Sequence, residues 1–476
     1  MDKSLHGICP QDYGTMTVKD HPIPDLTNHS LYTELRLQEN SRQTLQLMNG
    51  DVTSNSVETV SGVSARVCDQ GQWGFASLPE INDHSIRQVL QEAGNNAAFL
   101  AGQQGSQSAR LPDDSFSVSK DFSSQQPAAT QEQKLAFLKA IDRYVQDNCP
   151  SLESRIIRLH LETISKRVHT STGSQGFTRI PRTILTVCLV ASNDQQEPVE
   201  LLHIVSDRGE YQDVLTEPSS LYADIDKLYQ QLLDKKEAVP ASAGYKEVIL
   251  DSELSGLLAH EAVGHPVEAD LVLAGSVAAE LQGEMVASPI VSMVDFAHSC
   301  NGETLPVPVF IDDEGSKAED AVLIDQGRLT GFMHNRYSAA QLEQPSSGNA
   351  RAFKYFDEPL IRMRNTAILP GHDKLEAMIA SIDDGYYLIK SNNGEADATA
   401  EFMFGITLGY EIKNGKLGRA IQDTTISGMA FDVLKTVTMV SDDLHWECSG
   451  YCGKKQDIPV ACGGPAIKCK VHIGGE

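Results

Sequence analysis

Strand-type and helix-type patterns occupy separate stretches of this 476-residue chain, and this segregation is the strongest constraint on its fold. Short apolar runs with strand spacing occur at 31–38, 56–78, 155–172, 182–192 and 199–206. They are broken by turn residues, and the sequences NGD at 49–51 and DQGQ at 69–72 predict turns. Apolar residues at helical spacing occur at 85–102, 131–147 and 219–236. Runs that are segregated in this way predict an α+β fold and not a regular alternation of strands and helices.

The composition of the chain suggests where its domains begin and end. The stretch AVPASAG at 238–244 has linker composition, and the length suits two or three domains. We therefore expect an N-terminal α+β domain over 29–238 and a mostly β domain over 239–476. Residues 1–28 have no apolar period and predict a flexible arm, whereas the Ser-, Gln- and Pro-rich stretch 103–131 predicts a loop.

The second half of the chain opens with a strand-type run, YKEVIL, at 245–250. A helix is predicted from about Glu253 to Gly264, and further helices at 371–384 and 430–438. The rest of this half consists of apolar runs separated by turn dipeptides, which predicts strands.

Acidic residues outnumber basic residues by 65 to 39, which gives a formal net charge of -26. This balance argues against nucleic acid and against an anionic membrane surface as main partners, because both are bound through clustered Lys and Arg. We find no run of about 18 apolar residues and no apolar signal core at the start. Nine cysteines do not suit a small secreted disulfide framework. We expect a cytoplasmic protein whose thiols are mostly reduced.

The strongest chemical signal is LLAHEAVGHPVEAD at 257–270, which contains His260, Glu261 and His265. Two neutral imidazoles can hold a zinc ion, and an adjacent carboxylate can take a proton from water and return it later. The alternative interpretation is that both histidines are ordinary residues near a helix end. The pattern therefore predicts a hydrolytic metal site that needs further ligands.

The separation of the two histidines makes a structural demand. Zinc proteases commonly use H-E-x-x-H, because residues four apart share one face of a helix. His260 and His265 are five apart, which places them about 140° away from each other on an ideal α-helix. The helix must therefore widen by one residue as a π-type turn, or end before His265. Gly264 and Pro266 suit either solution.

A catalytic zinc site usually has a third protein ligand, and four cysteines lie near the C-terminus. Cys448, Cys452, Cys462 and Cys469 lack the paired C-x2-C spacing of a zinc ribbon. Cys452 lies between two glycines in GYCGKK, a tight turn that can present a thiolate, and Cys448 is the alternative ligand. Cys462 and Cys469 are expected to be small buried apolar residues.

Several other polar residues have two possible roles. Glu268 is a candidate to bond the second ring nitrogen of a ligand histidine, whereas Asp270 is expected to be a solvated loop acid. The acidic run FIDDEG at 310–315 lacks the spacing of a calcium loop and predicts a charged hairpin turn. The stretches 327–338 and 347–356 can line a substrate groove or form surface hairpins.

A family resemblance rests on several ordered motifs in this sequence. They are HEAVGHPVEAD, IDDEG, GRLTGFMHNR, SGNARAF, ILPG, GYEIKNGK and YCGKK. An N-terminal echo appears in YTELRLQ and GVSARVCDQGQWGFA. Together these motifs extend from about Leu31 to the end of the chain, and they resemble the TldD/PmbA (TldE) zinc metallopeptidase family. The PmbA/TldE partner of that family lacks the H-E-x3-H residues, so this chain is similar to the active TldD subunit.

The resemblance implies a specific site and architecture. It implies that His260, His265 and Cys452 bind Zn2+ and that Glu261 is the catalytic base. It also implies an N-terminal domain with a curved sheet and helices, followed by a largely β domain. The family forms dimers, usually with a PmbA/TldE subunit, and acts on extended or unfolded peptides in peptide maturation or the degradation of small proteins.

The sequence therefore predicts a zinc-dependent peptidase that binds its substrate as an extended strand along a sheet edge. One alternative is a non-catalytic, peptide-binding scaffold subunit in which the zinc is structural. A second is a metal-dependent amidohydrolase that acts on a small non-peptide substrate. A zinc-stabilised nucleic-acid regulator is disfavoured by the net charge of -26.

Overall fold

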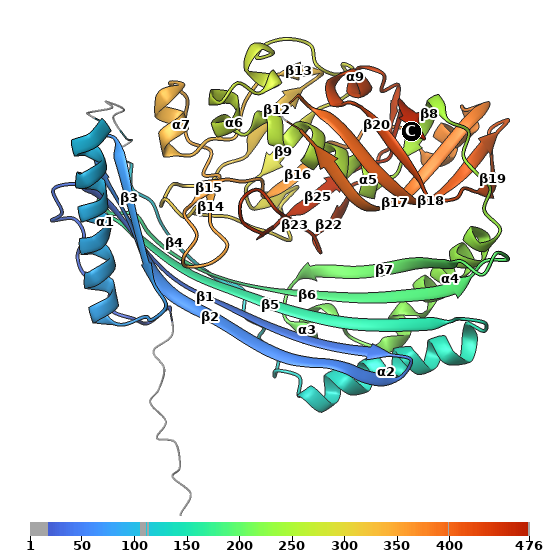
Figure 1. Cartoon of the computed structure of the whole chain (residues 1–476), viewed down its shortest axis with the longest axis horizontal. Helices are drawn as coiled ribbons and strands as arrows, with labels where there is room; N and C mark the ends of the chain where they lie inside the picture. The colour runs from blue at the N-terminus through green and yellow to red at the C-terminus, as the bar shows by residue number, and fades with distance from the viewer. Residues whose placement is uncertain (1–17, 105–110, 112–113, 398, 475–476) are drawn as a thin grey trace, which may run out of the picture.

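The first half of the chain forms one long, curved, mainly antiparallel sheet (Figure 1). The computed structural model describes residues 18–104, 111, 114–397 and 399–474. The strand order is β3-β2-β1-β5-β6-β4, and β7 also pairs with β6. The strands are β1 (Tyr32–Met48), β2 (Asp51–Asp69), β3 (Gln72–Leu78), β4 (Ser117–Asp121), β5 (Ser154–Thr170), β6 (Gln175–Ser192) and β7 (Pro198–Arg208). β4 lies in the expected loop 103–131 and pairs in parallel with β6, so that stretch contains a strand, while 105–110 and 112–113 lie outside the described residues.

Two-residue turns set the register of the first strands. Asn49 and Gly50 join β1 to β2 with φ angles of 52° and 88°, and Gln70 and Gly71 join β2 to β3 with 50° and 82°. Positive φ at both central residues is typical of the hairpin turns whose twist matches that of the strands. The turns predicted from the NGD and DQGQ sequences are therefore confirmed.

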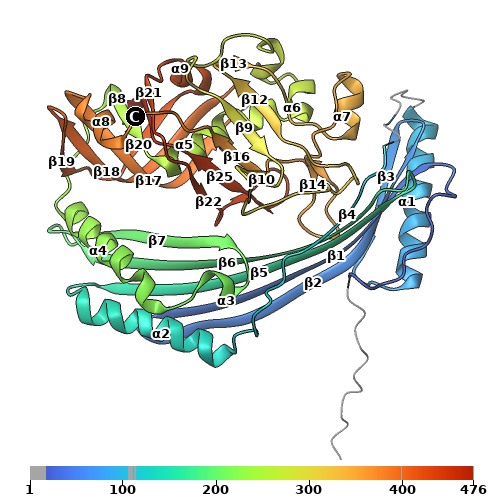
Figure 2. The ribbon, with the colours of Figure 1, turned by 180° about the vertical axis from the view of Figure 1, so that it is seen from behind.

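Helices cover the convex face of this sheet (Figures 1 and 2). The helices of this half are α1 (Asp83–Gln104), α2 (Gln131–Asn148), α3 (Tyr211–Val214), the 3-10 turn η1 (Pro218–Leu221) and α4 (Tyr222–Lys236). The predicted apolar stripe of α2 is buried at Phe137, Leu138 and Ile141, where it packs with side chains of the sheet and of α4. α1 runs through Gly94 without a break. The concave face of the sheet is thereby left for the second half of the chain.

The segment before β1 packs against the sheet as far as it is described. Val18 and Leu26 are 4% and 3% exposed and belong to one apolar cluster with Leu35 and Val63. Residues 18–28, part of the expected flexible arm, are therefore held by this cluster. Residues 1–17 lie outside the described part of the chain.

The described part of the second half forms two larger sheets and three small strand pairs. One large sheet has the order β17-β8-β26-β20-β18-β19, with β21 paired to β26, and the other has the order β13-β12-β9-β16-β25-β22. The strands are β8 (Gly244–Leu250), β9 (Met293–Phe296), β10 (Ser299–Cys300), β11 (Glu303–Thr304), β12 (Ala321–Asp325), β13 (Arg328–Leu329), β14 (Ala350–Arg351), β15 (Leu360–Ile361), β16 (Asn365–Ile368), β17 (Asp384–Ala396), β18 (Glu401–Lys413), β19 (Lys416–Ala420), β20 (Thr424–Met429), β21 (Met439–Val440), β22 (His445–Glu447), β23 (Tyr451–Cys452), β24 (Ile458–Pro459), β25 (Ala461–Gly464) and β26 (Ile467–Ile473).

Short helices connect these sheets, and one of them carries the histidines. They are α5 (Ser252–Leu257), the π-helix η2 (Leu258–Gly264), the 3-10 turns η3 (His265–Val267) and η4 (Val277–Glu280), α6 (Ala269–Leu273), α7 (Arg336–Gln341), α8 (Leu375–Ala380) and α9 (Ala430–Lys435). α8 and α9 are shorter than the helices predicted at 371–384 and 430–438. α5 packs against both β25 and β17, so it lies between the two sheets. The histidine helix is thus anchored in the main core of this half.

The α+β class is confirmed, because helices accompany sheets that are mostly antiparallel. The boundary predicted after residue 238 falls between α4 and β8 and remains a prediction. Among the residues that the structure describes, no helix is both long and apolar enough to cross a membrane.

The acidic turn at 310–315 is buried, which corrects the expectation of an ordinary charged hairpin. Asp313 and Glu314 are 6% and 0% exposed. Asp313 accepts a 2.6 Å bond from Lys166 on β5, and Glu314 accepts a 2.8 Å bond from Arg66 on β2. Buried carboxylates are costly unless they are paired. The turn therefore connects the second half of the chain to the concave face of the first sheet.

Candidate metal centre

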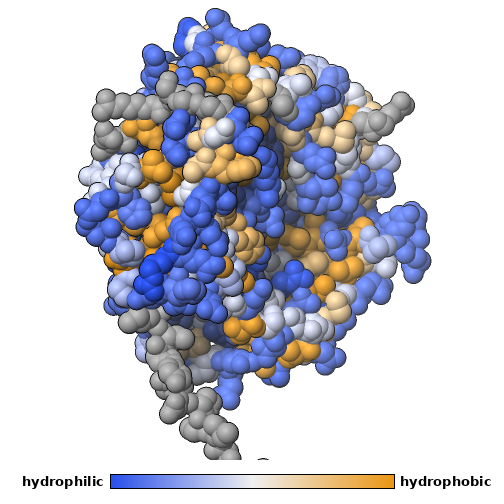
Figure 3. Space-filling model, turned by 60° about the vertical axis from the view of Figure 1, so that its left-hand side comes forward, coloured by the Kyte–Doolittle hydropathy of each residue, from blue (hydrophilic) through white to orange (hydrophobic). Residues whose placement is uncertain are grey.

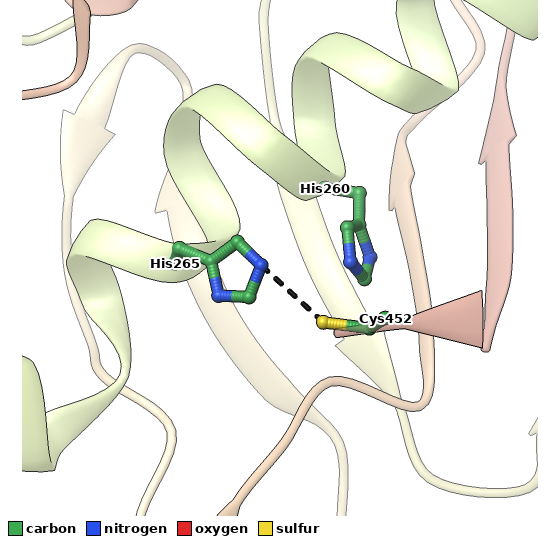
Figure 4. Close-up of side chains that lie close together, drawn as sticks. All are labelled: His260, His265 and Cys452. Atoms are coloured by element: carbon green, nitrogen blue, oxygen red, sulfur yellow. Dashed lines mark hydrogen bonds between the residues drawn. The ribbon is translucent and has the colours of Figure 1, made fainter. Parts of the chain in front are cut away.

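A π-helix brings the imidazoles of His260 and His265 together although the two residues are five apart in the sequence. Residues Leu258–Gly264 form this π-helix, and the His265 N–H donates to the carbonyl of His260, five residues earlier. A π-type turn holds more residues than an α-turn. The two imidazoles consequently face each other with ring centroids 5.3 Å apart (Figure 4). Of the two solutions that the five-residue separation allows, the structure has the widened turn.

Gly264 is needed because the π-helix packs closely against its neighbours. A Cβ atom at this position would lie 2.1 Å from Met363 Sδ and 3.1 Å from the Ala259 carbonyl oxygen. Met363 is fully buried, so its side chain has little room to move. The glycine therefore allows the helix that carries both histidines to seat in the core.

We expect Gly264→Ala to lower the free energy of unfolding by about 1–3 kcal/mol, because the added methyl overpacks the core. Gly94→Ala is the matched control, since a Cβ at Gly94 in α1 meets nothing within 4 Å. That substitution should be neutral or stabilise by up to about 1 kcal/mol. Urea unfolding measures both changes. Equal changes in the two variants would contradict the packing argument.

Cys452 completes the group of metal-binding atoms. It lies on β23, and its Sγ is 3.3 Å from Nε2 of His265 (Figure 4). The ligand atoms of His260, His265 and Cys452 all lie within 4.8 Å of one another. Burial raises the pKa of the Cys452 thiol, but the two imidazoles lower it further, to about 3. The thiolate is the form that binds a metal ion.

Glu261 lies on the same π-helix and faces both imidazoles. One of its carboxylate oxygens is 3.9 Å from Nε2 of His260, and the other is 3.5 Å from Nε2 of His265. Its side chain is 23% exposed, whereas that of His260 is only 2% exposed. The carboxylate is therefore next to the candidate ligand atoms and can still be reached by solvent.

Glu268 lies next to the second ring nitrogen of His265. Its Oε2 lies 3.0 Å from Nδ1 of His265 and accepts a 2.9 Å bond from Lys454. Lys454 also donates to Asp270 at 2.7 Å. Asp270, expected to be a solvated acid, is 38% exposed and is held by this lysine. Since Lys454 follows Cys452 by two residues, these bonds connect the cysteine strand to the histidine segment.

Cys462 lies beside His260, a location that sequence analysis did not predict. Burial lowers the pKa of His260, but its interactions with Cys462 and Cys452 raise that pKa well above its ordinary value. Cys462 is also only partly buried, contrary to the expectation of a buried apolar residue. Its β25 strand pairs with β16, from a distant part of the sequence, so no local pattern could have indicated this contact.

The other two cysteines are away from the candidate ligand atoms. Cys448 is fully buried with Val307 and Ala461, and burial raises the pKa of its thiol to about 12. A thiol with that pKa is not the ionised form that a metal ion requires. Cys469 is 1% exposed in the main core, as expected for a small apolar residue. Cys448, the alternative third ligand, is therefore disfavoured by its surroundings.

The donor set fits a zinc ion. Neither ring nitrogen of His260 makes a hydrogen bond to the described part of the chain, although both are buried. A buried imidazole that makes no hydrogen bond is costly, and a bound cation removes that cost. Two imidazoles and one thiolate are zinc donors, and three protein ligands with one open position are typical of catalytic zinc sites. The nearby Glu261 carboxylate is suited to proton transfer at such a site.

Comparison with known proteins gives consistent matches over nearly the whole chain. The model for the PmbA/TldA metallopeptidase C-terminal domain matches residues 243–475, and the model for PmbA/TldA metallopeptidase domain 1 matches 33–97. The zinc metalloprotease TldD homolog of Saccharolobus solfataricus is 29% identical over 87% of this chain and 90% of its own length. A metalloprotease of Archaeoglobus fulgidus is 30% identical over 93% of this chain and 99% of its own.

A solved structure has the same fold. TldE from Thermococcus kodakarensis aligns with a TM-score of 0.72 at 17% sequence identity, covering 93% of this chain and 97% of its own. At this identity the likeness concerns the arrangement of helices and strands.

Proposed function

This chain belongs to the PmbA/TldD metallopeptidase family, and we propose that it is a zinc-dependent peptidase that hydrolyses extended or unfolded peptides. The observation that carries the proposal is the Glu261 carboxylate, which lies within 4 Å of both candidate ligand imidazoles. A purely structural zinc site has no need of a partly exposed carboxylate at this position.

In this proposal His260, His265 and Cys452 hold the zinc ion. When bound, zinc would polarise the scissile carbonyl and acidify the attacking water. Glu261 takes a proton from that water and later gives it to the departing amine. Glu268 fixes the orientation of the His265 ring through its 3.0 Å contact with Nδ1.

We propose that the substrate lies as an extended strand along a sheet edge near the centre. Main-chain hydrogen bonds would then supply most of the binding, with weak dependence on sequence. Unfolded chains can adopt this form, whereas folded proteins cannot without opening. This mode suits peptide maturation and the degradation of small, unstable proteins.

We also propose that the chain acts as a dimer with a PmbA/TldE-like subunit in the cytoplasm. The likeness in fold to TldE supports a partner of similar shape. A reducing compartment is supported by the cysteines that the structure describes, which are all free. A site that depends on the Cys452 thiolate requires such a compartment.

Removal of zinc tests the proposal directly. Treatment with 1,10-phenanthroline should reduce hydrolysis of an unfolded polypeptide more than about 100-fold, and zinc should restore it. The assay uses the chain alone and with its partner subunit, and a stably folded protein serves as the control substrate. Activity that survives complete metal removal, or hydrolysis confined to small amides, would contradict the proposal.

A further inference from the structure

A cavity lies between the concave face of the first sheet and the second half of the chain. Its sheet wall is made by alternate residues of two paired strands, β5 and β6. They are Ile164, Lys166, Val168, Gly176, Thr178, Ile180 and Arg182. Alternate side chains of a strand point to the same face, and the register pairs Ile164 with Ile180 and Lys166 with Thr178. This wall is therefore one continuous face of the sheet.

The opposite wall comes from the second half of the chain and includes the strand partner of a proposed zinc ligand. It includes Pro306–Val309, Ile311, Phe353 and Ile458. Ile458 is the cross-strand partner of Cys452 in the β23–β24 pair. Both are buried in one apolar cluster with Phe353. A residue of the cavity wall and a proposed zinc ligand therefore lie directly across from each other in this strand pair, which places the cavity beside the candidate centre.

The charged residues of the cavity are already bonded to the protein. Lys166 donates a 2.6 Å bond to Asp313, and Arg182 donates a 2.8 Å bond to Glu162. Arg351 donates to main-chain carbonyls, at 2.7 Å in the case of Pro459. A charged ligand would have to compete with these bonds, so the surface left for a ligand is mainly apolar. Seen from the side on which α1 lies, apolar residues gather around a hollow in an otherwise largely hydrophilic surface (Figure 3).

We propose that this cavity binds one apolar side chain of the substrate, aliphatic or aromatic, next to the bond that is cut. The inference rests on the proposed peptidase function and adds a side-chain preference to it. Main-chain contacts along a sheet edge discriminate little between sequences. The cavity supplies the discrimination, since an apolar pocket distinguishes side chains by size and polarity.

The test uses blocked polyglycine peptides with a single leucine or a single asparagine at the centre. These side chains are similar in size and differ in polarity, and glycine offers no competing side chain. Zinc-loaded protein with Glu261→Gln should bind the leucine peptide at least about 10-fold more tightly by calorimetry. Wild-type protein should cut the leucine peptide at one bond, at a fixed distance from the leucine, as seen by mass spectrometry.

Two substitutions at Ile180, a half-buried wall residue, give opposite expectations. Ile180→Trp fills the cavity and should remove most of the preference for leucine over asparagine. Ile180→Ala enlarges it and should shift the preference towards phenylalanine. Leu202→Trp is the control, because Leu202 pairs with Cys188 on the same face of the sheet, is 38% exposed and lies outside the cavity. It should leave the preference unchanged.

The outcomes separate the inference from the proposed function. Hydrolysis at scattered bonds with no preference for leucine, or equal changes for all peptides in both Ile180 variants, would overturn the cavity assignment and leave the peptidase standing. Selective binding of the leucine peptide without any zinc-dependent hydrolysis would support the cavity and overturn the peptidase. A preference for asparagine would also overturn the assignment.

Discussion

Replacing Glu261 by glutamine should lower kcat for an unfolded polypeptide about 100- to 10,000-fold while zinc stays bound. Glutamine keeps the size of the side chain but cannot accept a proton from water. Glu261 is 23% exposed, so the fold should tolerate the change. Steady-state kinetics measures kcat, and metal analysis of the same preparations measures the zinc content.

Glu280→Gln is the control for the loss of one negative charge, because Glu280 is an exposed acid in the same half of the chain. It should leave both kcat and zinc content unchanged. If the Glu261 variant cleaves as fast as wild type with zinc bound, the proposed role of this carboxylate is wrong. If wild type itself binds peptides and zinc without cleaving them, a scaffold subunit with a structural zinc replaces the peptidase.

The contacts among His260, His265 and Glu268 could be predicted because these residues are close together in the sequence. A five-residue separation of His260 and His265 demands either a widened turn or a helix end, and the π-helix meets that demand. The bond between Glu268 and His265 likewise joins residues three apart. The hairpin turn at Asn49–Gly50 could be predicted for the same reason, since the type of a two-residue turn depends on the two residues in it.

Contacts between distant segments could not be predicted in this way. From the sequence alone, the acidic turn at 310–315 resembles a surface turn. In the structure its carboxylates bond Lys166 and Arg66, which lie 147 and 248 residues earlier in the chain. Cys462 was likewise expected to be a buried apolar residue, but the pairing of distant strands brings it beside His260. Both predictions were wrong because they used only the residue type and its neighbours in the sequence. The role of each residue depends on a partner that the sheet topology brings to it.

Replacing Cys452 by alanine should remove the zinc. We expect about one zinc ion per wild-type chain and less than about a tenth per Cys452→Ala chain after dialysis, because two imidazoles alone are a weak site. The thiolate is the only anionic donor among the three candidate ligands of the described site. Peptide hydrolysis should be lost in the same preparations, and metal analysis by mass spectrometry gives the zinc content.

Two further cysteines turn this measurement into a test of the type of site. Cys448→Ala should retain zinc, because that thiol is buried apart from the histidines and its pKa is raised to about 12. Zinc retained in Cys452→Ala but lost in Cys448→Ala would reverse the ligand assignment. Cys462→Ala should also retain zinc, since Cys462 is not among the three grouped ligands. Loss of zinc there would indicate a closed site with two histidines and two cysteines, which leaves no position for water and favours a structural metal.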